Sequence, residues 1–593
     1  MCGIIGYVGR EPACGVLLKG LSLLEYRGYD SAGVALLDGS RMQIRRSVGR
    51  VENLCRAAEG LPGCTGIGHT RWATHGQPTE ANCHPHVSGH LAVVHNGIIE
   101  NYQELRRALA ALGFEFVSQT DTEAVAHLIA SLYRGDLTAA VQEACGRLQG
   151  SYALAVVSSE HPGEIVAARK DSPLVIGLSR EGSYLCSDIP ALAEFTHTAY
   201  VLRDGETASL TAQGVRFFNR EGRSFAPPMQ TLNPVRIAAG TERFDCAMRT
   251  EIEEIPEALS NTLKNAEAGF PEELISRLSS CRSVIMIGCG TAYHAAVIGC
   301  MVMERCARIL SVARIAGEFR YQEPVLEENA VVVAITQSGE TADTLAGIRL
   351  AREAGAYVYA ITNVRDSSVT RCANDCFFTD AGKETAVCAT KSYNCQLAAL
   401  YALALAAAAR RNRECAEWRK SLAELPTLAR TALGRLSDAE SAQGYLLHAG
   451  NVFFLGRDLD YGTALEGALK LKEISYLPCE GYPAGELKHG TLALIDCRSV
   501  VLVLATQRRL YPKTLNAVHE VRARGAKVVL FSQSQELLDS ETAEVKILLP
   551  DAPDYLMPVL SVIPLQYLSC RTAVLLGYDP DKPRNLAKSV TVE

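Results

Sequence analysis

The chain has 593 residues, of which 48% are hydrophobic and 21% charged, and its formal net charge is -7. A single hydrophobic core does not serve a chain of this length, so we expect three or four domains. The composition excludes a disordered or low-complexity protein, and the mildly acidic charge gives no electrostatic reason to expect a nucleic acid or an acidic membrane surface as partner.

The cysteines and the apolar segments indicate a cytoplasmic protein without a membrane span. The longest apolar stretch, LAALYALALAAAA at 397–409, is shorter than the ~20 residues that a bilayer crossing needs and predicts a buried helix. The first residues lack the basic segment and long apolar core of a signal peptide. The 20 cysteines show neither C-x-x-C pairs nor zinc-like spacing, so we expect most of them to be reduced and buried, with no metal.

Residues 1 to about 218 carry short β-branched runs and loops rich in glycine and histidine, which predicts strands with functional loops. The segment begins MCGIIGYVG. If the methionine is removed, Cys2 offers a thiol nucleophile and an α-amine that can act as its base. The alternative is a small buried strand residue.

Three further motifs in this segment supply groups that suit an amino acid substrate. Arg71 in HTRWATHG can hold a carboxylate with its planar fork, and Asn96 with Gly97 in HNGIIEN offers donors to an oxyanion. A capping box from Thr120 to Glu123 puts Asp121 in the first turn of a helix, where it either complements the helix dipole or pairs with a substrate ammonium. Together these groups describe attack on the side-chain amide of glutamine.

Residues 219–247 lose periodicity and predict a linker. From about 275 the chain alternates apolar strands, glycine loops and amphipathic helices, which predicts parallel α/β layers. This pattern occurs twice, and we expect two tandem α/β domains at 275–414 and 443–583. The copies differ chemically, because TQSGET in the first corresponds to TQRRLY in the second.

The TQSGET segment follows a predicted strand and opens a helix, which is typical of an anion site. Its donors are Thr336, Gln337, Ser338 and Thr341. The alternative is ordinary helix capping by Ser338. GCGTAYHA at 288–295 has the same design but is a weak signal alone.

In the second copy Glu466, Lys470 and Glu473 share one helical face. A solvated salt-bridge ladder is the usual explanation of such spacing. The chain continues into GYPAGELKHG, which contains His489, and ends in PRNLAKSVTVE, which contains Lys588. A lysine can form an imine with a carbonyl while a glutamate moves a proton between adjacent carbons, and this chemistry suits a ketose phosphate.

MCGIIGYVG, LEYRGYDSAG, HTRWATHG, HNGIIEN and TDTE resemble the class II glutamine amidotransferase domain, an N-terminal-nucleophile αββα sandwich. The resemblance implies Cys2 as nucleophile and Asn96 with Gly97 as oxyanion hole. It implies a glutamine-binding set of Arg71, Trp72, Thr74, His75, His86 and Asp121. We expect His75 and His86 to order their loops rather than to act as bases.

The remainder resembles a pair of sugar isomerase (SIS) domains, doubly wound parallel α/β folds, and ISYLPCEGYPAGELKHG with PRNLAKSVTVE is its most specific part. The whole chain thus resembles a family of enzymes that use glutamine to convert fructose 6-phosphate to glucosamine 6-phosphate, the first step of hexosamine synthesis, without a cofactor. The resemblance implies Lys588 as the imine partner, Glu473 as the proton-shuttling base and His489, from the neighbouring subunit of a homodimer, in ring opening. The implied sugar-phosphate-binding residues are Cys289, Gly290, Thr291, Thr336, Gln337, Ser338, Thr341, Val387, Glu466, Lys470, Arg584 and Ala587. It further implies a tail at 584–593 that reaches the active site, and an ammonia channel gated near Trp72 and this tail.

The chain departs from the related sequences at several positions, two of which remove a hydroxyl. Ala292 replaces the usual serine after CGT, and VCATK at 387–391 replaces the usual VASTK, which puts Ala389 at a sugar-contact serine. Each change removes a hydroxyl worth ~1 kcal/mol if it binds the ligand. A sugar-phosphate deaminase or deglycase and a sugar-phosphate-binding regulator therefore stay open as alternatives. A phosphoribosyl transferase or asparagine synthetase is disfavoured by the repeated sugar domain and the lack of a P-loop or pyrophosphate motif.

Overall fold

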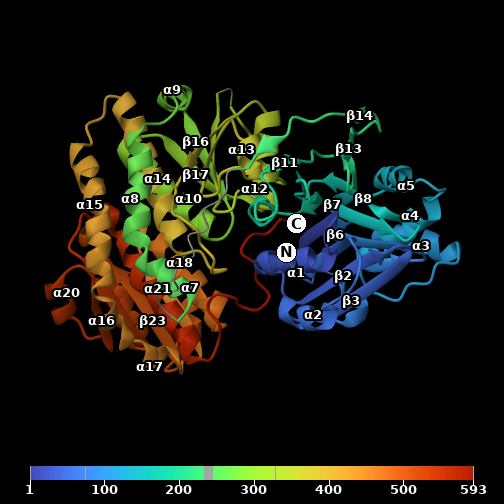
Figure 1. The fold of residues 1–593 in the computed structure, drawn as a ribbon. Coiled ribbons are helices and arrows are strands. Elements are labelled where there is room, and N and C mark those ends of the chain that lie inside the picture. Colours follow the sequence, from blue (N-terminus) through green and yellow to red (C-terminus); the bar gives the residue numbers. More distant parts are fainter. Residues whose placement is uncertain (1, 74, 233–244, 328, 592–593) are drawn as a thin grey trace. The chain divides into compact units, whose positions relative to one another are not determined.

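The computed structural model describes residues 2–73, 75–232, 245–327 and 329–591. The chain divides into two units, one made of residues 1–240 with 589–593 and the other of residues 241–588 (Figure 1). Residues 233–244 of the expected linker at 219–247 lie outside the described residues. Its first part contains two short strands, β14 (Ser224–Phe225) and β15 (Gln230–Thr231), each of which pairs with a sheet of the first unit.

The first unit contains two antiparallel sheets that face each other. One sheet has the order β15, β11 (Thr198–Val201), β9 (Val175–Leu178), β10 (Gly182–Cys186), β1 (Gly3–Gly9), β4 (Thr65–Arg71), β2 (Ser31–Asp38), β3 (Arg41–Val48). The other has the order β14, β13 (Gly214–Phe218), β12 (Thr207–Thr211), β8 (His161–Lys170), β7 (Gly150–Ser158), β6 (Leu91–Ile99), β5 (His86–Ser88). Apolar residues of both sheets, among them Ile4, Val94 and Ala155, form one core between them.

Helices cover the outer face of each sheet and complete an αββα sandwich, which confirms the expected fold. The first sheet packs against α1 (Ala13–Leu24), α2 (Val51–Ala58) and α6 (Ile189–Leu192), and the second against α3 (Tyr102–Ala111), α4 (Asp121–Leu132) and α5 (Leu137–Cys145). Two 3-10 turns, η1 (Glu25–Arg27) and η2 (Glu80–Asn82), lie in the connections. Because β1 is central in its sheet, Cys2 directly precedes a fully anchored strand.

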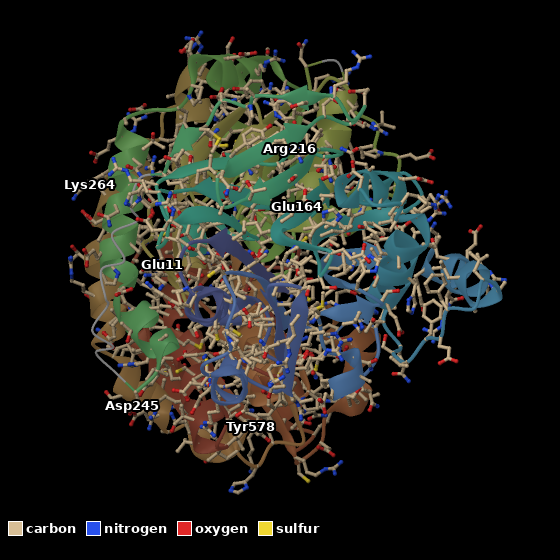
Figure 2. The ribbon with its side chains drawn as sticks, turned by 45° about the vertical axis from the view of Figure 1, so that its right-hand side comes forward. Glu11, Glu164, Arg216, Asp245, Lys264 and Tyr578 are labelled. Atoms are coloured by element: carbon tan, nitrogen blue, oxygen red, sulfur yellow. The ribbon has the colours of Figure 1, made fainter. Side chains whose placement is uncertain are left out.

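The second unit begins with α7 (Ala247–Glu253), α8 (Ile255–Glu267) and α9 (Glu272–Ser280). Helix α8 is amphipathic, with Ile255 and Leu259 buried and Lys264 exposed (Figure 2). A first parallel sheet follows, in the order β17 (Leu310–Ile315), β16 (Ser283–Gly288), β18 (Val331–Ile335), β19 (Tyr357–Thr362), β20 (Asp375–Phe378). Its helices are α10 (Thr291–Ala307), α11 (Ala316–Phe319), α12 (Ala342–Glu353), α13 (Ser368–Cys372) and α14 (Lys391–Arg410).

The second parallel sheet repeats this arrangement in the order β22 (Cys479–Pro483), β21 (Asn451–Gly456), β23 (Ser499–Ala505), β24 (Lys527–Ser532), β25 (Val545–Leu548). Its helices are α18 (Leu459–Ser475), α19 (Tyr511–Arg522), α20 (Gln535–Ser540) and α21 (Met557–Leu575), and α15 (Ala416–Leu433), α16 (Leu436–Glu440) and α17 (Gln443–Leu446) connect the two copies. The described residues of the second copy also form four 3-10 turns: η3 (Glu486–His489), η4 (Thr491–Leu494), η5 (Arg508–Leu510) and η6 (Asp554–Leu556). The two expected tandem parallel α/β folds are thus confirmed.

Both sheets have the doubly wound order 2-1-3-4-5, in which ligands bind outside the carboxyl ends of strands 1 and 3. In the first copy these ends carry the loops after β16 and β18. In the second copy the corresponding loops bind each other: Asp460 accepts from the backbone N–H of Thr506 at 3.0 Å, and Arg509 pairs with Asp458. Burial raises the pKa of Asp460 to about 7. In the second copy, polar groups of the chain itself therefore bind each other across the carboxyl ends of β21 and β23.

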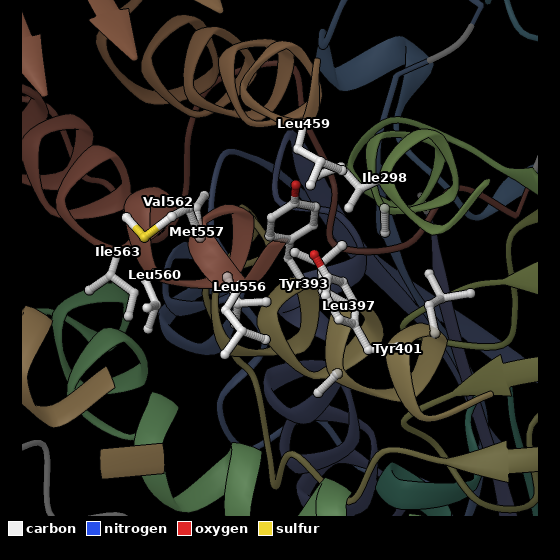
Figure 3. Close-up of a cluster of buried hydrophobic side chains, with 14 of the residues drawn as sticks. Ile298, Tyr393, Leu397, Tyr401, Leu459, Leu556, Met557, Leu560, Val562 and Ile563 are labelled. Carbon is white, nitrogen blue, oxygen red and sulfur yellow. The ribbon is translucent and has the colours of Figure 1, made fainter. Parts of the chain in front are cut away.

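One hydrophobic cluster joins the two copies. It includes Ile298 of α10, Tyr393 and Leu397 of α14, Leu459 of α18 and Leu560 of α21 (Figure 3). Among the described residues, two helical segments, Lys391–Arg410 and Asp554–Leu575, are long and apolar enough by composition to cross a membrane, but 83% of each window is buried inside the protein. Their apolar composition is explained by this shared core, and the expected buried alanine-rich helix is α14.

The two copies use glycine at the same place, where the first strand of each sheet meets its helix. A Cβ at Gly288 would lie 2.8 Å from the carbonyl carbon of Ala292, and a Cβ at Gly456 would lie 2.3 Å from the carbonyl oxygen of Asp460. These atoms belong to helical backbone and have little room to move. Glycine is therefore required for the helix to approach the strand this closely.

We expect Gly456→Ala to lower the free energy of unfolding by about 1–3 kcal/mol, because the added methyl overlaps the backbone of α18. Gly444→Ala is the matched control, since a Cβ there meets nothing within 4 Å. Thermal unfolding of the three proteins measures the difference. Equal melting temperatures for Gly456→Ala and the unsubstituted chain would contradict the steric argument.

Candidate functional site

The start of β1 brings Cys2 together with residues from two distant strands. The backbone N–H of Trp72, just after β4, donates to Cys2 Sγ at 3.4 Å. Asn96 Nδ2 of β6 donates to the carbonyl of Cys2 at 3.1 Å, and Arg27 Nε lies 3.3 Å from the same oxygen. Burial raises the pKa of the Cys2 thiol.

The side-chain amide of Asn96 is oriented from behind by a histidine. His69 Nε2 lies 3.1 Å from Asn96 Oδ1, which directs Nδ2 toward Cys2. Gly97 follows with φ of 132°, and a Cβ there would lie 2.1 Å from the carbonyl oxygen of Ser151. Only glycine fits this position.

Asp121 lies in the first turn of α4, as the capping motif predicts. Thr120 Oγ1 accepts from the Glu123 N–H at 3.4 Å, but the Glu123 carboxylate binds the N–H groups of Val117 and Ser118 instead of returning to Thr120. Only half of the capping box is therefore formed. Asp121 Oδ2 accepts from the Ile99 N–H at 2.9 Å, which ties α4 to the end of the strand that carries Asn96 and Gly97.

Arg71 and His86 act on the loops around this site. The buried Arg71 guanidinium donates to the carbonyls of His75 and of Gly76, the latter at 3.0 Å. His86 Nε2 lies 2.9 Å from Thr120 Oγ1, and burial lowers the pKa of His86 well below its usual value. These contacts fit the interpretation that His75 and His86 order loops. Thr74 lies outside the described residues.

Sequence reasoning did not single out a group of buried residues behind Asn96. Burial lowers the pKa of His69 to about 3 and that of His84 further below its usual value, so both imidazoles are neutral. Thr122 Oγ1 lies 3.0 Å from ring nitrogens of both His84 and His95. The sequence offered a signal for these residues, because Arg27 lies in LEYRGYDSAG, His69 begins HTRWATHG and His84 lies two residues before His86. Sequence reasoning assigned no role to any of the three.

In the second unit, the loop after β18 presents hydroxyls and the start of α12. Thr341 is the N-cap residue of α12. Ser338 Oγ accepts from the N–H of Glu340 at 3.2 Å, and Thr336 Oγ1 accepts from the N–H of Gly339 at 3.2 Å. Ser338 thus does not cap the helix, and capping is not its explanation. The Gln337 carbonyl accepts from the Asn363 N–H at 3.1 Å, which fixes the loop backbone.

Glu466, Lys470 and Glu473 form a buried row on α18 and not a solvated ladder. Lys470 Nζ lies 3.5 Å from Glu466 Oε1 and 2.8 Å from Glu473 Oε2, and the Lys470 side chain is 1% exposed. Thr291 Oγ1, at the start of α10, lies 3.2 Å from Lys470 Nζ, and His294 Nδ1 lies 2.8 Å from Glu466 Oε2. Burial disfavours the Lys470 ammonium, but Glu473 and Glu466 outweigh it and raise the pKa of Lys470.

Lys588 forms a buried ion pair with Glu384. Glu384 also accepts from Thr390 and Ser392, including the Thr390 N–H at 2.9 Å and the Ser392 hydroxyl at 2.8 Å. Burial would raise the pKa of Glu384, but Lys588 and these donors lower it to about 2. Burial and the nearby Glu384 raise the pKa of Glu251 to about 8, so Glu251 is largely protonated at neutral pH.

The other expected sugar-site residues differ in exposure and in contacts. His489 is exposed on η3, and among the described residues it has no hydrogen bond or ion pair to Glu473 or Lys588. Arg584 is exposed above the Tyr476 ring, with its Cζ 4.1 Å from the ring centroid. Ala292 is buried, and three residues are half-buried: Val387, Ala389 and Ala587. Cys289 Sγ lies 3.7 Å from Thr344 Oγ1. Gly290 is the N-cap residue of α10.

All 20 cysteines are free, ten of them buried and eight partly buried. Within the described part of the chain, no three histidine, cysteine, aspartate or glutamate side chains are grouped so that they could hold a metal ion.

Comparisons with known proteins match both units. The family model for the SIS domain matches residues 277–406 and 445–576, and that for the glutamine amidotransferase domain matches residues 69–194. The glutamine–fructose-6-phosphate aminotransferases (isomerizing) of Clostridium acetobutylicum and Symbiobacterium thermophilum are 45% and 46% identical over 608 and 612 residues, with full coverage of both chains.

A solved structure also resembles the second unit. The C-terminal domain of glucosamine-fructose-6-phosphate aminotransferase from Francisella tularensis is 34% identical with a TM-score of 0.55, covering 58% of this chain and 100% of that one. The fold, both domain matches and full-length identity agree. The chain belongs to the glutamine–fructose-6-phosphate aminotransferase (isomerizing) family.

Proposed function

We propose that this protein converts fructose 6-phosphate and glutamine to glucosamine 6-phosphate and glutamate. Full-length similarity to enzymes of that name supports the reaction. The observation that carries it is the arrangement of buried lysines in the second unit, where Lys470 binds Glu466 and Glu473 and where Lys588 binds Glu384. Buried charges of this kind persist only when paired, and they concentrate at functional sites.

Residues 2–218 supply ammonia in this proposal. After removal of the first methionine, the Cys2 thiol attacks the glutamine amide carbon and its proton passes to the α-amine and on to the departing nitrogen. Asn96 and Gly97 stabilise the oxyanion, and water then hydrolyses the thioester to glutamate. Arg71, Trp72, Thr74, His75, His86 and Asp121 surround the bound glutamine.

The domains at 275–414 and 443–583, with the tail at 584–593, use that ammonia. The loops at 289–291 and 336–341 with Val387, Arg584 and Ala587 bind the sugar phosphate, and His489 from a second subunit of a homodimer opens the ring. The Lys588 amine adds to the C2 carbonyl with loss of water, and ammonia then displaces the lysine. Glu473 carries a proton from C1 to C2, and Lys470 with Glu466 holds it in place.

The proposed reaction needs no metal or organic cofactor, and it takes place in the cytoplasm. Ammonia passes internally between the two active sites, gated near Trp72 and the tail.

We expect Cys2→Ala to lower glutamine-dependent product formation at least about 1,000-fold, since the nucleophile is lost. Conversion of fructose 6-phosphate to glucose 6-phosphate should remain detectable, because it does not use the thiol. Cys64→Ala, which removes an exposed cysteine, is the control. Product analysis by mass spectrometry measures both reactions, and glutamine-dependent synthesis by Cys2→Ala would disprove the thiol assignment.

We expect borohydride to trap a hexose phosphate on Lys588 of the unsubstituted protein, because reduction fixes the imine. Lys588→Arg should abolish the trapped mass, since a guanidinium forms no such imine. Lys383→Ala, an exposed lysine beside Glu384, should leave trapping unchanged. Peptide mapping locates the adduct, and an adduct elsewhere in the chain would contradict the role of Lys588.

We expect Glu384→Gln to lower the free energy of unfolding by about 3 kcal/mol at neutral pH, because Lys588 loses its buried partner. The pKa of Glu384, about 2, is below that of an unfolded glutamate. The ionised carboxylate therefore stabilises the fold above about pH 4, and this contribution is lost as pH falls toward 2.

Glu272→Gln is the control for this prediction, since it breaks an exposed ion pair with Arg410 and should cost under about 1 kcal/mol. Denaturant unfolding at pH 7 and pH 3.5 compares the three proteins. The Glu384→Gln and unsubstituted proteins should differ less in free energy of unfolding at pH 3.5 than at pH 7. A larger difference at pH 3.5 would contradict a stabilising ion pair between Glu384 and Lys588.

A further inference from the structure

The loop that precedes α14 puts a thiol against the carboxylate of Glu473. Cys388 Sγ lies 2.8 Å from Glu473 Oε2. Cys388 is 1% exposed, whereas the Glu473 side chain is 21% exposed. The contact is therefore shielded from water on the cysteine side, while the carboxylate retains one open side.

The thiol is the donor in this contact. Burial and the charge of Glu473 raise the pKa of the Cys388 thiol well above its usual value, although Lys470 and Lys588 act in the opposite sense. Cys388 therefore keeps its proton at neutral pH, and its S–H donates to the carboxylate. In a buried setting such a hydrogen bond restrains its acceptor more strongly than it would in water.

Both contacts of Glu473 use the same oxygen. Lys470 Nζ of α18 and Cys388 Sγ of the preceding loop each lie 2.8 Å from Oε2. Among the described residues, no hydrogen bond or ion pair reaches Oε1. Two donors from different elements thus fix the plane of the carboxylate and leave Oε1 for a substrate.

We propose that Cys388 is a positioning residue for the isomerisation, because its thiol holds Oε2 of Glu473 so that Oε1 carries the proton between two carbons of the sugar. This inference rests on the proposed function. Proton transfer at carbon depends steeply on distance and angle, so a carboxylate free to rotate would be a poorer base.

The test compares Cys388→Ala, Cys388→Ser and the control Cys300→Ala, which removes a thiol buried in the same hydrophobic cluster. We expect Cys388→Ala to lower kcat for isomerisation of fructose 6-phosphate about tenfold, with KM changed less than about twofold. Cys388→Ser should restore kcat to within about threefold of the unsubstituted enzyme, because a hydroxyl also donates. Incorporation of solvent deuterium into the sugar should slow in parallel, while borohydride trapping on Lys588 should not change.

Cys388→Ala with unchanged kcat would overturn the proposal. Equal losses in Cys388→Ala, Cys388→Ser and Cys300→Ala would also overturn it, because packing would then explain them. If Cys388→Ala does not fold, Cys388→Val fills the space without a donor and takes its place. An unsubstituted enzyme that neither isomerises the sugar nor forms the lysine adduct would instead refute the proposed function, and this inference with it.

Discussion

The second unit depends on one buried ammonium. Lys470 pairs with Glu466 and Glu473 on its own helix, and without it both carboxylates would lose their ammonium partner. The same ammonium contacts Thr291, so it also joins α18 of one copy to the start of α10 in the other. Removing either partner from such an arrangement leaves an uncompensated charge, whereas the complete set is stable. The position of Glu473 is thus a consequence of charge balance.

In the first unit, neutral rings do part of this positioning. His69 and His84 are neutral because burial disfavours their charged forms, and a neutral ring can both accept and donate a hydrogen bond. His69 uses this capacity to orient Asn96. The Asn96 amide that donates to the Cys2 carbonyl is therefore held in place by a neutral ring.

The two parallel copies were predictable from periodicity, because the pattern of strand, glycine loop and helix occurs twice along the chain. The sandwich was expected only from the resemblance of its motifs to the amidotransferase domain. The shared face of Glu466, Lys470 and Glu473 was predictable from helical spacing, but its burial was not, since solvent exposure depends on tertiary packing such as that of α10 through Thr291 and His294. Contacts such as Cys388 with Glu473 join residues 85 positions apart. Only tertiary packing decides which distant side chains meet, so no local pattern announces them.

The two copies share a strand order but have different loops at the carboxyl ends of their strands. In the second copy Asp460 binds Thr506 and Asp458 pairs with Arg509, so residues that follow β21 and β23 hold each other. In the first copy the hydroxyls of Thr336 and Ser338 instead accept from backbone N–H groups of their own loop. A shared topology therefore leaves the chemistry at the strand ends able to diverge, and the two halves are not interchangeable.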